Sequence, residues 1–360
     1  MKSTADLPGS INGGQAFVAI DIGASNTRIA VKGVDGKGGH IKRKVNSKPA
    51  LFALLNEANT AFKKAGIVVL AAGVAGPGPR SPDGTRLGPF SNYTSEDQHL
   101  YRDELPSTLC PKGKTVLLND LEAAAYGVAG VAGGNSYSSY FSKMWGTNTA
   151  FDLRNGPCLV VAPGTGLGCG LIYMSESGKP SVMCLEFGHS SLAADAGDEA
   201  WLRQLATKVY TKPLPVEWED VVSGRGLVAC WYRCALDAKL IDASSVTDAG
   251  QVAQRALDGC PVAGKAMWLH YKYALAFASD LVMGFVCGSV VFTGDNIVNN
   301  QFYLGKSDVV SDLQNEFMSH TSARFGFHQK VSVYRQTQSV NLNLEGAFFK
   351  AKAFMPVSKL

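Results

Sequence analysis

Leu118-Asn119-Asp120-Leu121 stands at the end of an apolar run and directly before an alanine-rich segment. We expect a strand from Thr115 to Leu118 that carries a carboxylate at its C-terminal tip, followed by a helix that leaves the sheet. In open α/β sheets, ligands bind at the carboxyl ends of the strands. Asp120 can there accept a proton from a bound hydroxyl group, as phosphoryl transfer to an alcohol requires. An Asp at a strand end is also a common helix N-cap, so the tetrapeptide alone leaves both roles open.

Two glycine-rich turns each connect a pair of expected strands. The first turn begins at Asp21, between segments 17–20 and 29–34, and the second, Gly164-Thr165-Gly166-Leu167-Gly168, follows segment 158–162. Backbone N–H groups in such turns form anion-binding nests, and glycine permits close approach of a ligand. The pair therefore predicts that the turns hold the phosphates of one nucleotide, although each turn alone also suits a plain hairpin.

Neither turn matches a better-known phosphate motif. The chain contains no GxxxxGK[ST] sequence. The second turn is not a dinucleotide-binding fingerprint, because Cys169 occupies the sixth position and a strand rather than a helix is expected to follow. Asp21, at the first turn, suits a Mg²⁺ ion on the phosphates, often reached through water.

A set of polar residues falls at expected loop positions beside apolar strands: Asn119, Asp120, Glu186, His189 and Glu219. Each carboxylate can accept hydrogen bonds from two hydroxyl groups, and His189 and Asn119 can donate, so the set suits a small polyhydroxylated ligand. From spacing alone, two other readings stay open. Glu219 also suits the first turn of a helix, and His189 also suits a hydrogen-bonded position in the core.

Composition limits the function further. The chain has 360 residues, 46% hydrophobic and 18% charged, which is an ordinary soluble composition for about two domains. A net charge of +4 is far from the basic stripe of a nucleic-acid binder, so no nucleic-acid partner is expected.

The longest apolar region, 273–292, contains Asp280 and two glycines, so we expect a buried helix and a strand there, with no membrane partner. The 8 cysteines are scattered without a CxxC pair, which favours buried thiols in a reducing compartment over a metal site.

Both ends of the sequence bear on where the protein is expected to be located. Residues 1–14 are polar and lack the apolar core of a signal peptide, so secretion is not expected. The last three residues, Ser358-Lys359-Leu360, form a receptor-read address for peroxisome-type organelles. We therefore expect a peroxisomal-type import receptor as a partner and a microbody as the location.

Five motifs occur in the order in which bacterial-type glucokinases carry them, and the chain resembles that family from Phe17 to Gly346. The motifs are DIGASNTR at 21–28, LLND at 117–120, APGTGLG at 162–168, LEFGH at 185–189 and EDVVSG at 219–224. Two more, GDNIVNN at 294–300 and RFGF at 324–327, are similar to those of trypanosomatid glucokinases. Those enzymes reside in glycosomes, which are modified peroxisomes, in agreement with the C-terminal tripeptide.

The resemblance implies an α/β protein of the actin-like ATPase (ribonuclease H-like) fold, with two α/β domains around a central cleft. Residues 1–118 plus 345–360 would form the small domain and residues 119–344 the large one. The implied activity is that of a transferase that phosphorylates D-glucose at its 6-hydroxyl with ATP, the first step of glycolysis. Mg²⁺ would accompany the ATP, and the enzyme would be a glycosomal homodimer.

Carried over by motif, the resemblance also implies residue roles. Asp120 would be the general base, and Asn119, Glu186, His189 and Glu219 would bind the other sugar hydroxyls together with it. The ATP phosphates would be held by two loops, Asp21, Gly23, Ala24, Ser25 and Asn26 in one and Gly164, Thr165 and Gly166 in the other. Ser223, Gly224, Thr293 and Gly294 would flank the adenosine, and Asp21 would reach Mg²⁺, in part through water.

The sequence departs from the family pattern at three places. Ala24-Ser25 stands where the family commonly has Gly-Thr, and both residues are small enough for the turn to persist. Gly294-Asp295 replaces the Gly-Gly of many bacterial relatives, so the nucleotide donor is less well predicted than the sugar. No CxCGxxGC zinc signature follows His189, so no structural metal is expected. The alternatives are a kinase for another hexose or amino sugar, a donor other than ATP, and a non-catalytic sugar sensor.

Overall fold

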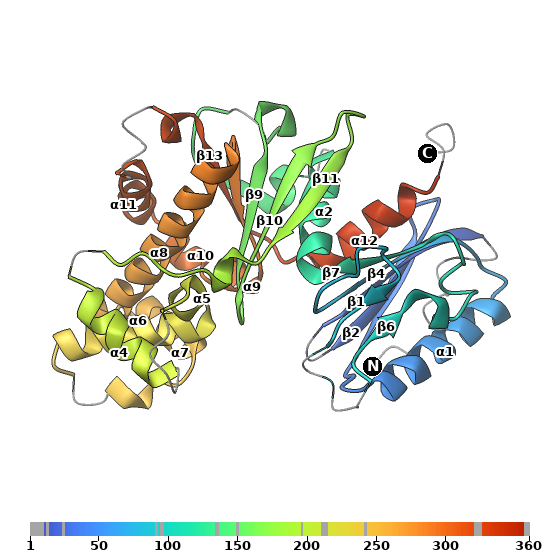
Figure 1. The fold of residues 1–360 in the computed structure, drawn as a ribbon, viewed down its shortest axis with the longest axis horizontal. Helices are drawn as coiled ribbons and strands as arrows, with labels where there is room; N and C mark the ends of the chain where they lie inside the picture. Colours follow the sequence, from blue (N-terminus) through green and yellow to red (C-terminus); the bar gives the residue numbers. More distant parts are fainter. Residues whose placement is uncertain are drawn as a thin grey trace. The chain divides into compact units, whose positions relative to one another are not determined.

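The computed structural model describes residues 11, 14–23, 26–90, 93, 97–133, 137–148, 151–195, 197–209, 215–240, 243–319 and 326–355. The chain divides into two compact units. The first unit consists of Met1–Asn135 and Asn341–Leu360, and the second of Ser136–Val340. Each unit contains a β-sheet with helices against it and has a hydrophobic core of its own (Figure 1).

The first unit is built on a five-stranded sheet in the order β3-β2-β1-β4-β7. Its strands are β1 (Gln15–Ile22), β2 (Thr27–Gly33), β3 (Gly38–Arg43), β4 (Val68–Gly76) and β7 (Thr115–Asn119). β1 is antiparallel to β2 and parallel to β4, and β4 is parallel to β7. The carboxyl ends of β1, β4 and β7 therefore lie at one edge, where the first glycine-rich turn and the Asn119-Asp120 pair both occur.

One face of this sheet is covered by α1 (Lys48–Lys64), which begins at the N-cap Ser47 with a proline in its first turn. Its buried side consists of apolar residues at helical spacing: Leu51, Leu54, Leu55, Ala58 and Phe62. Short elements connect β4 to β7, namely β5 (Arg86–Leu87), β6 (Leu100–Tyr101) and the 3₁₀ turn η2 (Arg102–Glu104).

The helices α2 (Asp120–Gly133) and α12 (Leu342–Lys352) pack against each other within the first unit, although they are far apart in the sequence (Figure 1). Two glycines allow their backbones to touch. A Cβ atom on Gly127 would collide with the carbonyl oxygen of Leu342, and one on Gly346 with that of Ala123. Because of this contact, residues 119–135 and 341–344 belong to the first unit, which differs from the predicted division at 118/119 and 344/345.

The second unit contains a six-stranded sheet in the order β11-β10-β9-β12-β13-β8. Its strands are β8 (Phe141–Trp145), β9 (Cys158–Pro163), β10 (Leu167–Met174), β11 (Pro180–Leu185), β12 (Ser289–Phe292) and β13 (Ser332–Gln336). β9, β12 and β13 are parallel, and β10, β11 and β8 are antiparallel to their neighbours. The order β11-β10-β9-β12-β13 repeats the plan of the first sheet, and the two predicted strand–turn–strand starts are the β1–β2 and β9–β10 hairpins.

Most helices of the second unit follow β11 in the chain. They are α4 (Glu199–Val209), α5 (Trp218–Val221), α6 (Gly224–Asp237), α7 (Ala249–Leu257), α8 (Pro261–Phe285), α9 (Asp295–Asn299), α10 (Gln301–Leu304) and α11 (Ser307–Met318). The remaining short elements are α3 (Tyr137–Tyr140), η3 (Leu153–Asn155), η4 (Phe187–His189), η5 (Ala243–Ser245) and η7 (His328–Lys330). The apolar region 273–292 forms the end of α8 and then β12, as predicted, and no helix in the described ranges could cross a membrane.

All eight cysteines are free thiols, and five of them are buried: Cys110, Cys158, Cys169, Cys230 and Cys287. Burial raises the pKa of the Cys110 thiol to about 12, which keeps it protonated and unreactive at neutral pH. The five buried cysteines therefore serve as small core residues, as the sequence predicts.

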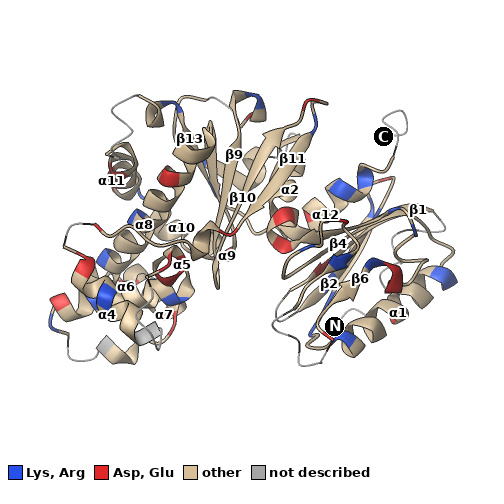
Figure 2. Cartoon of the chain, in the orientation of Figure 1, with Lys and Arg blue, Asp and Glu red and all other residues tan. Residues whose placement is uncertain are grey.

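Basic and acidic residues are scattered over the ribbon of both units (Figure 2).

Candidate active site

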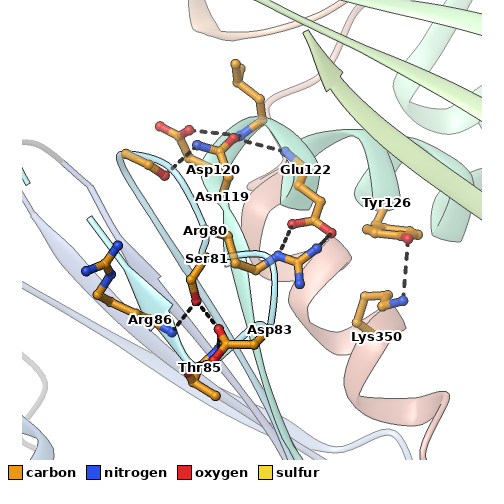
Figure 3. A network of polar contacts seen from close by, with 12 residues as sticks. Arg80, Ser81, Asp83, Thr85, Arg86, Asn119, Asp120, Glu122, Tyr126 and Lys350 are labelled. Carbon is orange, nitrogen blue, oxygen red and sulfur yellow. Dashed lines mark hydrogen bonds and ion pairs between the residues drawn. The ribbon is translucent and has the colours of Figure 1, made fainter. Parts of the chain in front are cut away.

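Asn119 and Asp120 stand at the point where β7 ends and α2 begins (Figure 3). The Asn119 side chain accepts a hydrogen bond from the Leu121 N–H at 2.9 Å and donates one to the carbonyl oxygen of Gly78 at 2.9 Å. Asp120 Oδ1 also accepts from the Leu121 N–H at 2.9 Å. Asn119 thus caps the helix and ties it to the turn after β4, and Asp120 presents a carboxylate at the positive end of α2.

A second contact holds the same turn against α2 (Figure 3). The Arg80 guanidinium donates to both carboxylate oxygens of Glu122, with Nε–Oε2 at 3.1 Å and Nη2–Oε1 at 3.3 Å. Glu122 is buried, and Arg80 follows the turn that Asn119 contacts. Sequence reasoning missed this pair, because an acid in the first turn of a helix also suits the helix dipole without any partner.

Asp21 lies at the end of β1 and is 2% exposed. Its carboxylate accepts hydrogen bonds from Arg28 at 3.0 Å, from Asn341 at 2.8 Å and from Asn343 at 3.0 Å. Both asparagines come from the start of α12, at the other end of the sequence, and sequence reasoning did not find them. These donors contact both carboxylate oxygens, so Asp21 would reach a Mg²⁺ ion on a nucleotide through water. Within the described residues, no three His, Cys, Asp or Glu side chains form a metal site.

The rest of the first turn is a tight hairpin. The Gly23 N–H donates to the Asn26 carbonyl oxygen at 3.0 Å, which closes the turn between β1 and β2. A Cβ atom on Gly23 would lie 3.0 Å from that oxygen, so glycine suits this position. The predicted phosphate-loop residues Ala24 and Ser25 lie outside the described residues.

The second glycine-rich turn, Gly164 to Gly166, joins β9 to β10 and is held from two sides. The Gly164 N–H donates to the Gly166 carbonyl oxygen at 2.8 Å across Thr165. The Gly164 carbonyl oxygen accepts from the Gly224 N–H at 2.8 Å, at the start of α6. Asn296 donates to the Pro163 carbonyl oxygen at 3.1 Å. The turn is thus fixed by the segments predicted to flank the adenosine.

Glu219 lies against this turn, in the first turn of α5. Its Oε2 atom accepts a hydrogen bond from the Leu167 N–H at 2.9 Å, and its Oε1 atom accepts from Arg225 at 2.9 Å. A Cβ atom on Gly166 would lie 2.6 Å from Oε2, so a side chain there would displace the carboxylate from this position. The structure therefore confirms that Glu219 lies in the first turn of a helix, and it also brings this carboxylate to the second glycine-rich turn.

Glu186 precedes η4 and His189 is its last residue, directly after β11, and both are exposed. The His189 Nδ1 atom lies 2.9 Å from Oε2 of Glu217, a residue that sequence reasoning missed. This hydrogen bond is the main cause that raises the pKa of His189, with further contributions from the charges of Glu219, Glu217 and Glu186 and an opposing effect of partial burial. With a side chain 56% exposed, His189 is not a core histidine. Three of the predicted sugar-binding residues thus lie beside the second glycine-rich turn: Glu186, His189 and Glu219.

A cavity of about 240 Å³ opens beside the start of α6. Ser223 and Gly224, both predicted to flank adenosine, line it together with Leu227, Ala249, Gly250, Ala253, Gln254, Leu257, His270, Asn296, Asn299, Asn300 and Phe302. Burial lowers the pKa of His270 to about 4, so its ring is neutral at pH 7. Its Nδ1–H donates to the Val221 carbonyl oxygen at 2.9 Å.

Thr293 and Gly294, the other predicted adenosine residues, do not line this cavity, and the nearby Asn296 does. The Gly294 N–H donates to Oε1 of Gln336 at 2.9 Å, and the Thr293 hydroxyl donates to the same oxygen. The backbone at Gly294 has φ = +105°, which favours glycine, and a Cβ atom there would meet open space. The segment therefore positions α9 and Asn296 and does not itself form the cavity wall.

Three comparisons place the chain among known proteins. The family model named Glucokinase matches residues 18–315. "Probable glucokinase 2" of Trichomonas vaginalis is 29% identical, over 93% of this chain and 92% of its own length. The crystal structure of glucokinase from Balamuthia mandrillaris in complex with glucose is 33% identical, with a TM-score of 0.81 over 96% of each chain. That of Leishmania braziliensis glucokinase is 28% identical, with a TM-score of 0.82 over 94% of this chain and 93% of its own.

The similar structures confirm the predicted fold class, an actin-like ATPase fold of two α/β units. A trypanosomatid enzyme is among them, as the resemblance of the sequence motifs predicts. Because the family model spans most of the sequence, the chain belongs to the glucokinase family.

Proposed function

We propose that the chain transfers the γ-phosphoryl group of ATP to the 6-hydroxyl of D-glucose, with Asp120 as the general base. Membership of the glucokinase family and the similarity to a glucokinase that binds glucose support the reaction. The observation that carries the assignment of the base is the arrangement at the end of β7. The Asn119 side chain caps α2 there, and Asp120 is the next residue, directly after the end of the strand.

The sugar would take its other partners from Asn119, Glu186, His189 and Glu219. The bond between His189 Nδ1 and Glu217 supports a role in sugar binding, because it fixes the ring and directs Nε2 to a hydroxyl group. Hydrogen bonds that involve a charged group contribute about 1.5–3 kcal/mol each, so a few of them suffice for a hexose.

The nucleotide would lie along the second glycine turn, with adenosine in the cavity beside Ser223 and Gly224. The neutral His270 and the Asn296 amide offer polar contacts there without a charge. Mg²⁺, when bound with ATP, neutralises charge on the phosphates. Asp21 would hold it through water.

In this mechanism Asp120 orients the 6-hydroxyl and takes its proton as the phosphoryl group transfers. The transition state of phosphoryl transfer is loose, so positioning and charge neutralisation supply most of the acceleration. The N–H groups of the glycine turns stabilise negative charge on the phosphates. The product would be glucose 6-phosphate, which makes the reaction the first step of glycolysis.

The test is glucose-dependent release of ADP from Mg·ATP by the purified wild type, with Asp120→Asn assayed in parallel. The variant keeps the shape of the side chain and removes the base, so we expect kcat to fall about 10²–10⁴-fold with a much smaller effect on glucose affinity. Near-normal turnover by Asp120→Asn would reject the base. A panel of mannose, fructose and N-acetylglucosamine separates glucose phosphorylation from the alternative of another hexose or amino sugar.

We also propose that the chain is imported into a glycosome-like microbody through Ser358-Lys359-Leu360 and acts as a homodimer. The tripeptide itself supports the first point, and family resemblance supports the second. Microscopy of the full chain in a cell with microbodies, with and without these three residues, tests the location. Retention of the shortened chain in the microbody would contradict the role of the tripeptide. Sedimentation of the purified protein tests whether it is a dimer.

A further inference from the structure

We infer that Arg225 is a positioning residue that makes the binding of sugar and nucleotide cooperative, an inference that rests on the proposed function. Its guanidinium connects Glu219, a proposed sugar ligand, to the start of α6, which lines the proposed nucleotide cavity. A closed ring of contacts within the second unit supports this role. It runs from the glycine turn through Glu219, Arg225 and Gly224 back to the turn.

The first part of the ring is the Arg225 guanidinium. One nitrogen, Nη2, donates to Oε1 of Glu219 at 2.9 Å and to Oδ1 of Asp220 at 3.0 Å. The Asp220 side chain is 1% exposed, and its other oxygen, Oδ2, accepts from the Glu217 N–H at 3.0 Å. Arg225 is therefore held by a fixed, buried carboxylate, and in turn it holds the carboxylate of Glu219.

The second part is the contact of Glu219 with the glycine turn. Its Oε2 atom accepts from the Leu167 N–H, the last backbone donor of the turn before β10 continues. The missing side chain of Gly166 leaves room for this carboxylate at the turn. A shift of Glu219 on sugar binding would therefore move, or free, a backbone donor of the phosphate-type loop.

The third part returns through α6. Gly224, the neighbour of Arg225, donates from its N–H to the Gly164 carbonyl oxygen at 2.8 Å and lines the 240 Å³ cavity. Arg225 thus belongs to the same helical turn that forms the cavity wall. A nucleotide that orders this turn would also order Arg225 and, through it, Glu219, so either ligand would prepare the site of the other.

The test is a binding cycle without turnover. The dissociation constant of Mg·AMP-PNP is measured with and without saturating glucose, and that of glucose with and without Mg·AMP-PNP. Coupling between two sites typically changes affinity 5- to 150-fold, and we expect roughly tenfold for the wild type. By linkage, the two measurements must give the same factor. In Arg225→Gln the factor should fall to about one, and in Arg225→Lys, which keeps the charge, it should be partly restored.

The matched control is Arg233→Gln, because Arg233 lies on the same helix and pairs with Asp237 at 3.4 Å, outside the ring. This variant should keep the wild-type factor. A wild-type factor of one, or an unchanged factor in Arg225→Gln, would overturn the inference even if the enzyme phosphorylates glucose. If Arg225→Gln does not fold, the partial loss in Arg225→Lys decides, and an unchanged factor there is a refutation. Failure of the wild type to bind either ligand would reject the proposed function as well.

Discussion

Asn119 and Asp120 are adjacent residues whose side chains have different physical tasks. Asn119 satisfies a backbone N–H at the start of α2 and donates to the carbonyl oxygen of Gly78. Asp120 carries the negative charge proposed for proton transfer. We therefore expect a change at Asn119 to affect mainly stability and a change at Asp120 to affect mainly catalysis.

We expect Asn119→Ala to lower the free energy of unfolding by about 0.5–2 kcal/mol, the usual effect of removing a helix cap. Asp120→Asn should leave it nearly unchanged, because a carboxamide oxygen can still accept from the Leu121 N–H. Urea unfolding of the two variants beside the wild type measures the difference. Equal stability of Asn119→Ala and the wild type would contradict the capping role.

His189 owes its raised pKa first to the hydrogen bond with Glu217, so glucose binding should depend on pH through this pair. The imidazolium form is present below the raised pKa and is lost as the pH rises through it. Glu217→Gln removes the carboxylate, so the pKa of His189 should fall and the loss of glucose affinity should begin at lower pH. Between that pH and the wild-type pKa, KM for glucose should rise about three- to tenfold.

NMR titration of the His189 ring gives the pKa directly, and KM as a function of pH gives its effect on binding. Glu199→Gln, which removes an exposed acid at the start of α4, is the control and should change neither quantity. An unaltered His189 titration in Glu217→Gln would show that the pair does not set the charge.

At the scale of elements, the start of α2 is held by contacts with the turn after β4. The Arg80–Glu122 pair and the Asn119–Gly78 bond connect the same two segments (Figure 3). A catalytic group displaced by about 1 Å can lose activity 10²-fold, so these contacts should affect catalysis as well as stability.

We expect Glu122→Gln to destabilise the protein by about 1–3 kcal/mol, because it leaves the Arg80 guanidinium without its charged partner. We expect kcat to fall roughly tenfold, less than in Asp120→Asn, because the base itself remains. Thermal unfolding and initial rates measure both effects. Arg86→Gln is the control, since the backbone of Arg86, not its side chain, contacts Ser81 in the same loop. A Glu122→Gln enzyme with wild-type kcat would show that the pair does not position Asp120.

Local sequence patterns predict the elements that depend on their own residues. The spacing of apolar residues predicts α1, and the two glycine turns predict the β1–β2 and β9–β10 hairpins. Contacts between distant segments leave no such pattern. The packing of α2 on α12 decides the boundary between the units, and the α12 asparagines that hold Asp21 are more than 300 positions away. Glu217 and Arg225 were missed for the same reason, because their partners follow from where α5 and α6 lie.

The whole molecule repeats one sheet plan in two units, each with its own core. In each sheet a hairpin with a glycine-rich turn precedes the parallel strands, so each unit can present backbone N–H groups at a strand end. The second unit also buries titratable side chains. One of them is His270, which is 4% exposed and donates to the Val221 carbonyl oxygen.

His270 should make the stability of the molecule depend on pH in the mildly acidic range. Burial lowers its pKa from the ordinary histidine value of 6.5 to about 4 in the folded protein. Above about pH 6.5 both the folded and unfolded states carry a neutral ring, so the full stability is present. Between pH 6.5 and 4 only the unfolded state binds the proton, so this contribution is lost as the pH falls, by at most about 1.4 kcal/mol per pH unit.

Denaturant unfolding from pH 7 to pH 4.5 measures this slope for the wild type and for His270→Asn. The asparagine amide can take the place of Nδ1–H toward Val221, and it does not titrate, so the variant should lose stability less steeply over this interval. His40→Gln is the control, because His40 is exposed on β3 and its removal should leave the slope unchanged. Identical slopes for the wild type and His270→Asn would mean that the second unit takes up the proton without unfolding, and that His270 is accessible to water through the cavity that it lines.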